Sequence, residues 1–230
     1  MTATLGILAV AGDDTLGLPR YISSSNWNET ASSSATDLQW QHTVTADTTC
    51  LVICAGWTDS ASPTTANNAY FNGVSLTRYN TVVYSSNSQT QIFYLLNPPK
   101  GTFTARSLYA GSIDRLSAAM AINLGGVKEV LTSGGNSLGS GGTRSVTLSL
   151  SKPGVIVGAP WGYNSGTGVP TLTMPAPPNS IQAQTSSNSS SGYGKRITVF
   201  YTPLQPAGSV VCSVNFGIGD NTILNFAAFG

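Results

Sequence analysis

The chain has 230 residues, which is enough for one substantial hydrophobic core or two small ones. Only 8% of the residues are charged, against roughly 25% in ordinary soluble domains, and the formal net charge is +1. This balance argues against nucleic acid as the main partner. No stretch approaches the ~20 apolar residues of a transmembrane helix, and the N-terminal residues lack the basic region of a signal peptide.

The composition favours strands over helices. The 25 glycines and 12 prolines, with Ser, Thr and Asn in place of charge, suit short strands joined by tight turns. Solvated helices usually carry Glu, Lys and Arg, which are scarce in this chain. Aromatic and β-branched residues occur throughout, which disfavours disorder. We therefore predict an all-β protein.

Residues 1–40 are predicted to form an extended N-terminal arm. Apolar patches precede a Ser-rich connector at 23–36, in which Trp27 is a natural anchor. The arm has a formal charge of −3, from Arg20 against four acids, and the rest of the chain has +4. A mildly acidic arm could dock on the body of its own chain or on a neighbouring copy, although a chance imbalance of charge is the simpler explanation.

The rest of the chain is a succession of short apolar or alternating segments, typical of strands. Asn72-Gly73 is the strongest hairpin signal. The Ala-rich segment 116–124 could be a short helix, but its counterpart at 223–229 argues for a strand. The expected strands cover 39–45, 50–57, a hairpin at 69–77, 81–84, 91–96, 101–108 and 116–124, and then, after a Gly/Ser bridge at 132–142, the segments 144–150, 154–161, 171–174, 180–185, 195–202, 209–216 and 222–229.

Two segments repeat in the same order along the chain. The segment 91–102 returns in a looser form at 198–209, with the Phe-Tyr pairs 107 residues apart. The segment 51–57 aligns with 155–161, with the two tryptophans 104 residues apart. Two matches in the same order and at nearly the same offset predict an internal duplication.

The repeat suggests how the strands form a body. Turns recur about every 8–12 residues, as in a sandwich or barrel. One copy alone would make a thin sheet with long edges, whereas two copies face to face bury one apolar side each. We predict a jelly-roll-like β-sandwich body at 41–230, with a first copy at 44–123, a second copy at 148–230 and the arm and connector at 1–40.

The three cysteines are predicted to be small buried apolar side chains. Cys50 and Cys54 lie on one expected strand with their Cα atoms about 13 Å apart, too far for a disulfide. Cys212 could pair with either only if the fold brings them together. No metal-ligand spacing is present, so neither a metal nor a cofactor is expected.

No catalytic constellation stands out. A Ser/His/Asp triad would need His42, the only histidine, which sits in an alternating strand. The one Gly-x-Ser-x-Gly match, at 135–139, lies in the Gly/Ser bridge and lacks the strand and helix of a nucleophile elbow. The nine acids mostly fall in apparent loops without a glycosidase-like pair, and Asp13-Asp14 lacks the spacing of a calcium loop. We predict that the protein is not an enzyme.

Aromatic residues beside polar ones could bind a sugar or a protein partner. Trp57 with Asp59, and Trp161 with Tyr163, end the repeated strand and could flank equivalent loops. Together with Trp27, they are the candidate interaction residues. The phase of both tryptophans along the strand is that of apolar neighbours, which favours a place in the core or at its rim instead.

Three segments, Leu51–Asp59, Phe71–Thr77 and Phe93–Thr102, resemble a family of β-sandwich domains found in phage structural proteins and modular bacterial surface proteins. The resemblance covers most of residues 44–230, and its most specific part is the Tyr-Leu-Leu-Asn-Pro turn with the upstream Asn-Gly hairpin. The family carries no catalytic motif, and its members look like decoration, adhesion or assembly modules. This chain differs from the secreted members because the domain has its own arm and no secretion signal, which favours the virion version.

The resemblance implies a virion structural protein, specifically a capsid decoration (cement) protein of a tailed phage, assembled in the host cytoplasm. The expected partners are copies of itself, with a trimer as one form of homo-oligomer, and the major capsid protein. Neither nucleic acid nor a membrane is an expected partner. The alternative is a glycan-binding tail-fibre or adhesin module that recognises a host glycan.

Overall fold

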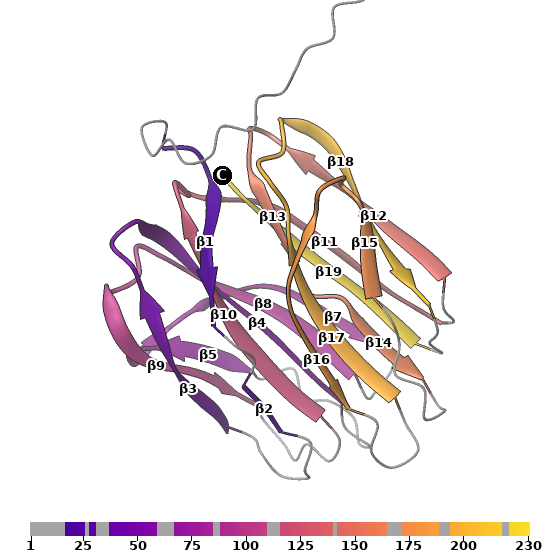
Figure 1. Ribbon diagram of the computed structural model, residues 1–230, viewed down its shortest axis with the longest axis horizontal. Coiled ribbons are helices and arrows are strands. Elements are labelled where there is room, and N and C mark those ends of the chain that lie inside the picture. Colours follow the sequence, from indigo (N-terminus) through magenta and orange to yellow (C-terminus); the bar gives the residue numbers. More distant parts are fainter. Residues whose placement is uncertain are drawn as a thin grey trace, which may run out of the picture.

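The computed structural model consists of β-strands stacked in four layers (Figure 1). All named strand pairs are antiparallel, and the segment 116–124 is a strand, so the predicted all-β fold is confirmed. The structure describes residues 17–25, 28–30, 37–58, 67–84, 88–109, 116–139, 142–164, 172–188, 194–217 and 221–230.

The first half of the chain forms an inner and an outer sheet. The inner sheet has the order β1-β10-β4-β8-β7, with β2 also paired to β10, and the outer sheet has the order β3-β9-β5-β6. The strands are β1 (Arg20–Ser24), β2 (Asn28–Thr30), β3 (Asp37–Val44), β4 (Thr48–Thr58), β5 (Asn68–Phe71), β6 (Val74–Ser75), β7 (Thr77–Tyr84), β8 (Ser88–Leu96), β9 (Gly101–Leu108) and β10 (Leu116–Gly125).

The second half also forms two sheets. In its inner sheet, β11 pairs with β19, and β19 pairs on its other side with both β13 and β14. These two short strands also pair with β17, which pairs on its far side with β16. The outer sheet has the order β12-β18-β15. The strands are β11 (Val130–Gly139), β12 (Gly142–Leu150), β13 (Val155–Gly158), β14 (Trp161–Asn164), β15 (Leu172–Ala176), β16 (Ile181–Asn188), β17 (Gly194–Tyr201), β18 (Gly208–Phe216) and β19 (Asn221–Phe229).

Both halves follow the same strand order. The inner order β1-β10-β4-β8-β7 corresponds to β11-β19-β13/β14-β17-β16, and the outer order β3-β9-β5 corresponds to β12-β18-β15. Two sheets with this connectivity form a jelly roll. A shared order is what the predicted duplication requires, although the duplication itself stays a prediction.

Local irregularities occur at matching places in the two halves. The register of β1 against β10 shifts at Ile22, and the register of β11 against β19 shifts at Leu131. The register at the other edge of the inner sheet shifts at Tyr79 in β7 and at Ala183 in β16. Bulges re-aim the strand and its side chains, so the two halves bend their edge strands alike.

The two inner sheets pack against each other and share one core. Its residues come mainly from β4, β8 and β10 on one side and from β13, β14, β17 and β19 on the other. Cys54 and Met120 of the first half, and Trp161 and Ile197 of the second, are fully buried there. Because each such side chain contributes about 1.5–3 kcal/mol when it leaves water, this layer holds the halves together.

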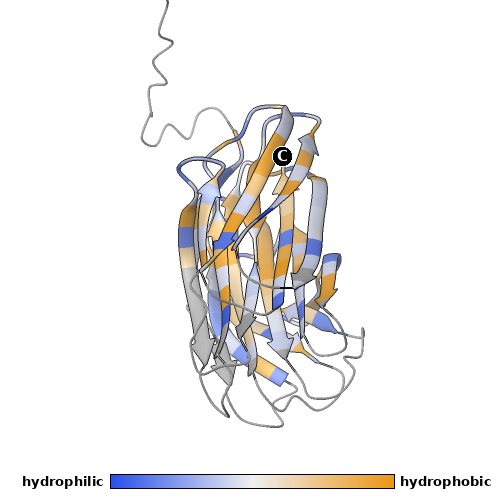
Figure 2. Ribbon diagram, turned by 90° about the vertical axis from the view of Figure 1, so that its right-hand side faces the viewer, coloured by the Kyte–Doolittle hydropathy of each residue, from blue (hydrophilic) through white to orange (hydrophobic). Residues whose placement is uncertain are grey.

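Each half also has a core of its own, between its inner and outer sheets. Phe71 and Phe93 are buried in the first half, and Phe216 and Phe226 in the second. Viewed from the side of the second half, the strands carry apolar and polar bands (Figure 2). The β-sandwich is confirmed, but each half makes its own sandwich and the two stack, whereas the sequence suggested that two copies close one sandwich.

Glycines allow the two halves to approach closely. A Cβ atom on Gly56 of β4 would lie 2.7 Å from Ile197 Cδ1, across the shared core. A Cβ atom on Gly135 of β11 would lie 2.3 Å from Val82 Cγ2 of β7 and 2.6 Å from the Leu224 carbonyl oxygen. All three distances are shorter than the contacts that real Cβ atoms make, and the contacts with Ile197 and Val82 cross between the halves, so larger residues at these glycines would push the halves apart.

Two predicted loop segments are strands in the structure. Residues 20–24 and 28–30 of the predicted arm pair with β10 and belong to the body. The predicted Gly/Ser bridge is mostly β11, which pairs with β19 from Val130 to Gly139. Gly and Ser have low strand propensity, but hydrogen bonds to a buried neighbour strand override that preference. Residues 1–16 of the arm lie outside the described residues.

The cysteines are buried and unpaired, as predicted. Burial raises the pKa of the Cys50 and Cys212 thiols to about 12, so neither is a thiolate at neutral pH. Cys50 and Cys54 belong to the shared core, and Cys212 belongs to the core of the second half.

One polar side chain ties the two halves together inside this layer. Asn225 of β19 is fully buried, and its amide nitrogen donates to the Thr90 carbonyl oxygen at 3.1 Å and to Thr90 Oγ1 at 3.2 Å. Its amide oxygen accepts a hydrogen bond from Asn80 Nδ2 at 2.9 Å. Both partners come from the first half, so these hydrogen bonds fix how the inner sheets are aligned.

Asn225→Ala should lower the free energy of unfolding by about 1–3 kcal/mol, because the substitution leaves the buried Thr90 and the half-buried Asn80 without their partner. Urea denaturation followed by circular dichroism measures this change. Asn215→Ala is the matched control, since Asn215 is an exposed residue of β18. Equal stability of the two variants would contradict the role given to Asn225.

Candidate interaction surface

The structure does not bring the five predicted interaction residues together. Trp57 is 3% exposed and packs against Tyr109 with ring centroids 5.0 Å apart. Trp161 is fully buried in the shared core. The backbone of Tyr163 lies in β14 and pairs with β17 and β19, but its side chain lies outside the described part of the structure, as do Trp27 and Asp59.

The two tryptophans are not structurally equivalent, although the sequence aligned them. Trp57 faces the core of the first half, and Trp161 faces the shared core. In the ladders, Phe93 lies opposite Ile53, whereas the matching Phe200 lies opposite Gly158. By this pairing, Gly158 is the counterpart of Ile53, so the matching strands are 105 residues apart rather than the 104 of the sequence alignment. A shift of one residue along a strand turns a side chain to the other face, which is why the two tryptophans face different cores.

The described surface has a groove where β1 of the first half meets β16 and β17 of the second. The groove has a volume of about 340 Å³, and its walls are mostly apolar. It is lined by Pro19, Arg20, Tyr21, Val155, Ile181, Tyr201, Thr202, Pro203 and Leu204. We call it the seam groove, since it lies on the seam between the two halves.

A stacked pair of tyrosines closes one side of the seam groove. The rings of Tyr21 in β1 and Tyr201 in β17 lie parallel within 6°, with centroids 3.9 Å apart. Burial raises the pKa of the Tyr201 hydroxyl, so this side chain stays neutral at physiological pH. The stack joins segments that are far apart in the chain, and it gives the groove a rigid wall.

Apolar side chains are exposed around this groove. Ile181 is 45% exposed and Leu204 is 38% exposed, and Leu18 next to the groove is 43% exposed. The described residues include only two other large exposed apolar side chains, Val74 and Val211, which belong to the outer sheets. An exposed apolar cluster of this kind marks an interaction site more often than scattered residues do.

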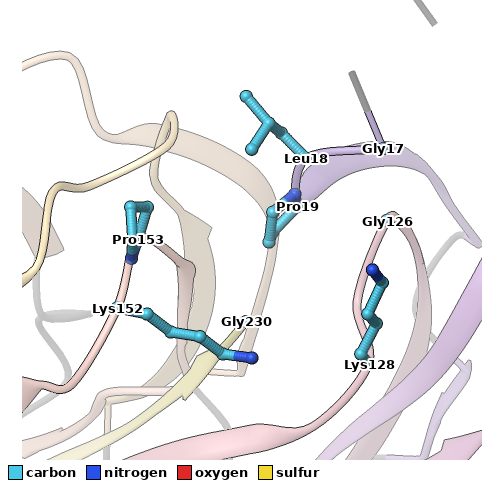
Figure 3. A pocket seen from close by; sticks show the side chains of 8 residues that line it. All are labelled: Gly17, Leu18, Pro19, Gly126, Lys128, Lys152, Pro153 and Gly230. Atoms are coloured by element: carbon cyan, nitrogen blue, oxygen red, sulfur yellow. The ribbon is translucent and has the colours of Figure 1, made fainter. Parts of the chain in front are cut away.

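A smaller basic hollow adjoins the seam groove and shares Pro19 with it. Figure 3 shows Lys128 and Lys152 on opposite sides of this hollow, below Gly17 and Leu18. Its volume is about 170 Å³. Lys152 pairs with Glu129. The segment that leads into β1 therefore enters the fold between the seam groove and a hollow lined by Lys128 and Lys152.

The corresponding seam on the other side of the shared core is filled. There Tyr79, the bulge residue of β7, packs against Tyr94 with centroids 5.7 Å apart and hydrogen-bonds the Ser133 side chain. Val82 approaches Gly135 closely on the same seam. The residue at the corresponding register shift of β16 is Ala183, which has a much smaller side chain and packs against the shared core.

No arrangement for acid–base or nucleophilic chemistry appears among the described residues. His42 is 5% exposed, and its Nε2 lies 3.0 Å from the Asn123 amide oxygen inside the first half. Ser137 of the Gly-x-Ser-x-Gly match is paired with Ile223 within a regular ladder of the second half. The described part of the chain holds no cluster of three or more His, Cys, Asp or Glu residues that could bind a metal ion.

No protein-family model, curated protein or solved structure matches this chain. Within the described ranges, no helix is present that is long and apolar enough to cross a membrane. Only its geometry and exposed apolar side chains therefore indicate that the seam groove is an interaction site. Sequence reasoning missed it because its walls come from four separate stretches, 19–21, 155, 181 and 201–204, and no local motif joins them.

His42 provides a pH test of the core of the first half. Burial lowers its pKa, and the hydrogen bond to Asn123 opposes that shift only in part. Below pH ~6.5 the histidine of the unfolded chain binds a proton, whereas buried His42 in the folded chain binds one only at lower pH. The contribution of His42 to stability is therefore complete above pH ~6.5 and declines as the pH falls below it, by at most about 1.4 kcal/mol per pH unit.

The chain has one histidine, so NMR titration of its ring protons reports His42 directly. The expected midpoint lies below 6.5 in the folded protein. The Asp37–Arg106 ion pair, whose Oδ1–Nε distance is 2.7 Å, lowers the Asp37 pKa and acts only in a more acidic range. A midpoint at or above 6.5 would contradict the burial of His42.

Proposed function

We propose that this chain is a non-enzymatic structural protein of a virus particle, a capsid decoration (cement) protein of a tailed phage. The observation that carries the proposal is the seam groove, an exposed apolar site beside which the N-terminal segment joins the body. The resemblance of Leu51–Asp59, Phe71–Thr77 and Phe93–Thr102 to phage and bacterial surface domains supports the same assignment.

The physical properties of the body suit a shell component. Two stacked sandwiches with three cores form a stiff block with few charges, so its contacts depend little on salt. Jelly rolls occur both in viral capsid proteins and in lectins, so the fold alone does not distinguish a capsid role from glycan binding. The proposed partners are the major capsid protein and copies of the chain itself, on a particle assembled in the host cytoplasm.

The glycan-binding alternative has less support. It depended on aromatic side chains at the surface, and Trp57 and Trp161 are both buried. What remains for it are Trp27, Asp59 and Tyr163, whose side chains lie outside the described residues.

Co-sedimentation with empty capsids of tailed phages tests the proposal. We expect saturable binding with a fixed number of copies per capsid, and binding should change little between low and high salt because few charges are involved. Bound protein should also raise the temperature at which the capsids break. A chain that stays in the supernatant at every concentration, yet binds defined sugars on a glycan array, would overturn the proposal in favour of the adhesin alternative.

A further inference from the structure

We propose that the seam groove binds the apolar N-terminal segment Leu5–Val10 of a second copy of this chain. This inference deepens the proposed function, on which it rests, because it names the contact by which neighbouring copies would join. It concerns self-association only and can be tested without any capsid.

The first argument is the chemistry of the groove. Ile181 and Leu204 keep more than a third of their surface exposed beside the buried Val155 and the Tyr21–Tyr201 stack. Its volume of about 340 Å³ is roughly twice that of an engineered ~150 Å³ apolar cavity that takes up benzene. Such a site takes aliphatic side chains rather than charged ones.

The second argument is the composition of the segment. Residues 1–16 contain Leu5, Ile7, Leu8 and Val10 within six positions, and no Lys or Arg. A short apolar run in an otherwise polar, Ser-rich N-terminal region is stabilised when an apolar surface covers it. The seam groove is an exposed, mostly apolar site among the described residues.

The third argument is charge. Asp13 and Asp14 follow the apolar run, and they are the only acids of residues 1–16. Lys128 and Lys152 line the hollow that adjoins the groove, and Arg20 lies in the groove wall. Glu129 offsets part of this charge through Lys152, so the net attraction is modest. An apolar run followed by two acids matches an apolar groove next to a basic hollow.

The connection between the segment and the body is long enough to reach a second copy. Pro19 of the chain already lines both hollows, so the segment that precedes it starts at the rim of its own groove. The six residues between Val10 and Gly17 span at most about 25 Å when extended, which is enough to reach an adjacent molecule. Reciprocal exchange would fill the grooves of both copies and close the assembly.

The test is sedimentation velocity of the full chain across a wide concentration range, with three full-length variants. The segment variant carries Leu5→Ser, Ile7→Ser, Leu8→Ser and Val10→Ser, and leaves every described residue unchanged. The groove variant carries Ile181→Lys and Leu204→Lys. The control variant carries Val74→Lys and Val211→Lys, which alter equally exposed residues of the outer sheets.

We expect the unaltered chain and the control variant to self-associate alike, and the segment and groove variants each to associate at least about tenfold more weakly. An equimolar mixture of the segment and groove variants should form mixed pairs, because one intact segment still meets one intact groove. Should the groove variant fail to fold by circular dichroism, the segment variant alone decides between loss and retention of association.

Two results would overturn the inference. One is an unaltered chain that stays monomeric at all concentrations, which would mean that its own segment or nothing fills the groove. The other is self-association that neither variant weakens. A monomeric chain that binds capsids would support the proposed function and reject this contact. Self-association through the groove without capsid binding would support the contact and reject the proposed function.

Discussion

The packing of the two inner sheets against each other is the interaction on which the rest of the structure depends. It buries apolar residues of both halves in one layer, including Met120 from the first and Ile197 from the second. Without this layer, each half would expose one face of its inner sheet to water. The hydrogen bonds of Asn225 to Thr90 and Asn80 then select one alignment among the many that apolar packing would tolerate.

That packing also creates the candidate interaction surface. Because the halves are stacked with β1 beside β17 on one seam and β7 beside β11 on the other, the two seams can carry different residues. Tyr79 packs against Tyr94 on one seam, and the smaller Ala183 stands at the matching bulge of β16. The two similar sandwiches therefore differ at their seams, and the seam beside β1 carries the apolar seam groove.

Much of the fold could be predicted from local patterns, and the rest could not for physical reasons. Alternating segments such as the one around Trp40 and the Asn72-Gly73 turn specify strands and a hairpin through neighbouring residues alone. The strand β11 could not be predicted, since Gly134 and Gly135 favour turns and their extended form depends on pairing with β19. Long-range pairing of this kind leaves no local signal.

The candidate site shows the same limit more strongly. The phase of Trp57 and Trp161 indicated a place in the core, and both are buried. The alignment of their strands was off by one residue, because an apolar run on a strand buried on both faces does not specify which face a side chain takes. The seam groove depends on which strands of the two halves lie side by side, so only the three-dimensional arrangement reveals it.

The central claim is that the two halves fold as one unit around the shared core. Labelling of the natural cysteines during urea denaturation tests it most directly, since Cys54 lies in the shared core and Cys212 lies in the separate core of the second half. Mass spectrometry of the labelled peptides gives a midpoint for each thiol. One common midpoint for Cys54 and Cys212 is the predicted result, and a Cys212 that becomes labelled while Cys54 stays protected would contradict the account.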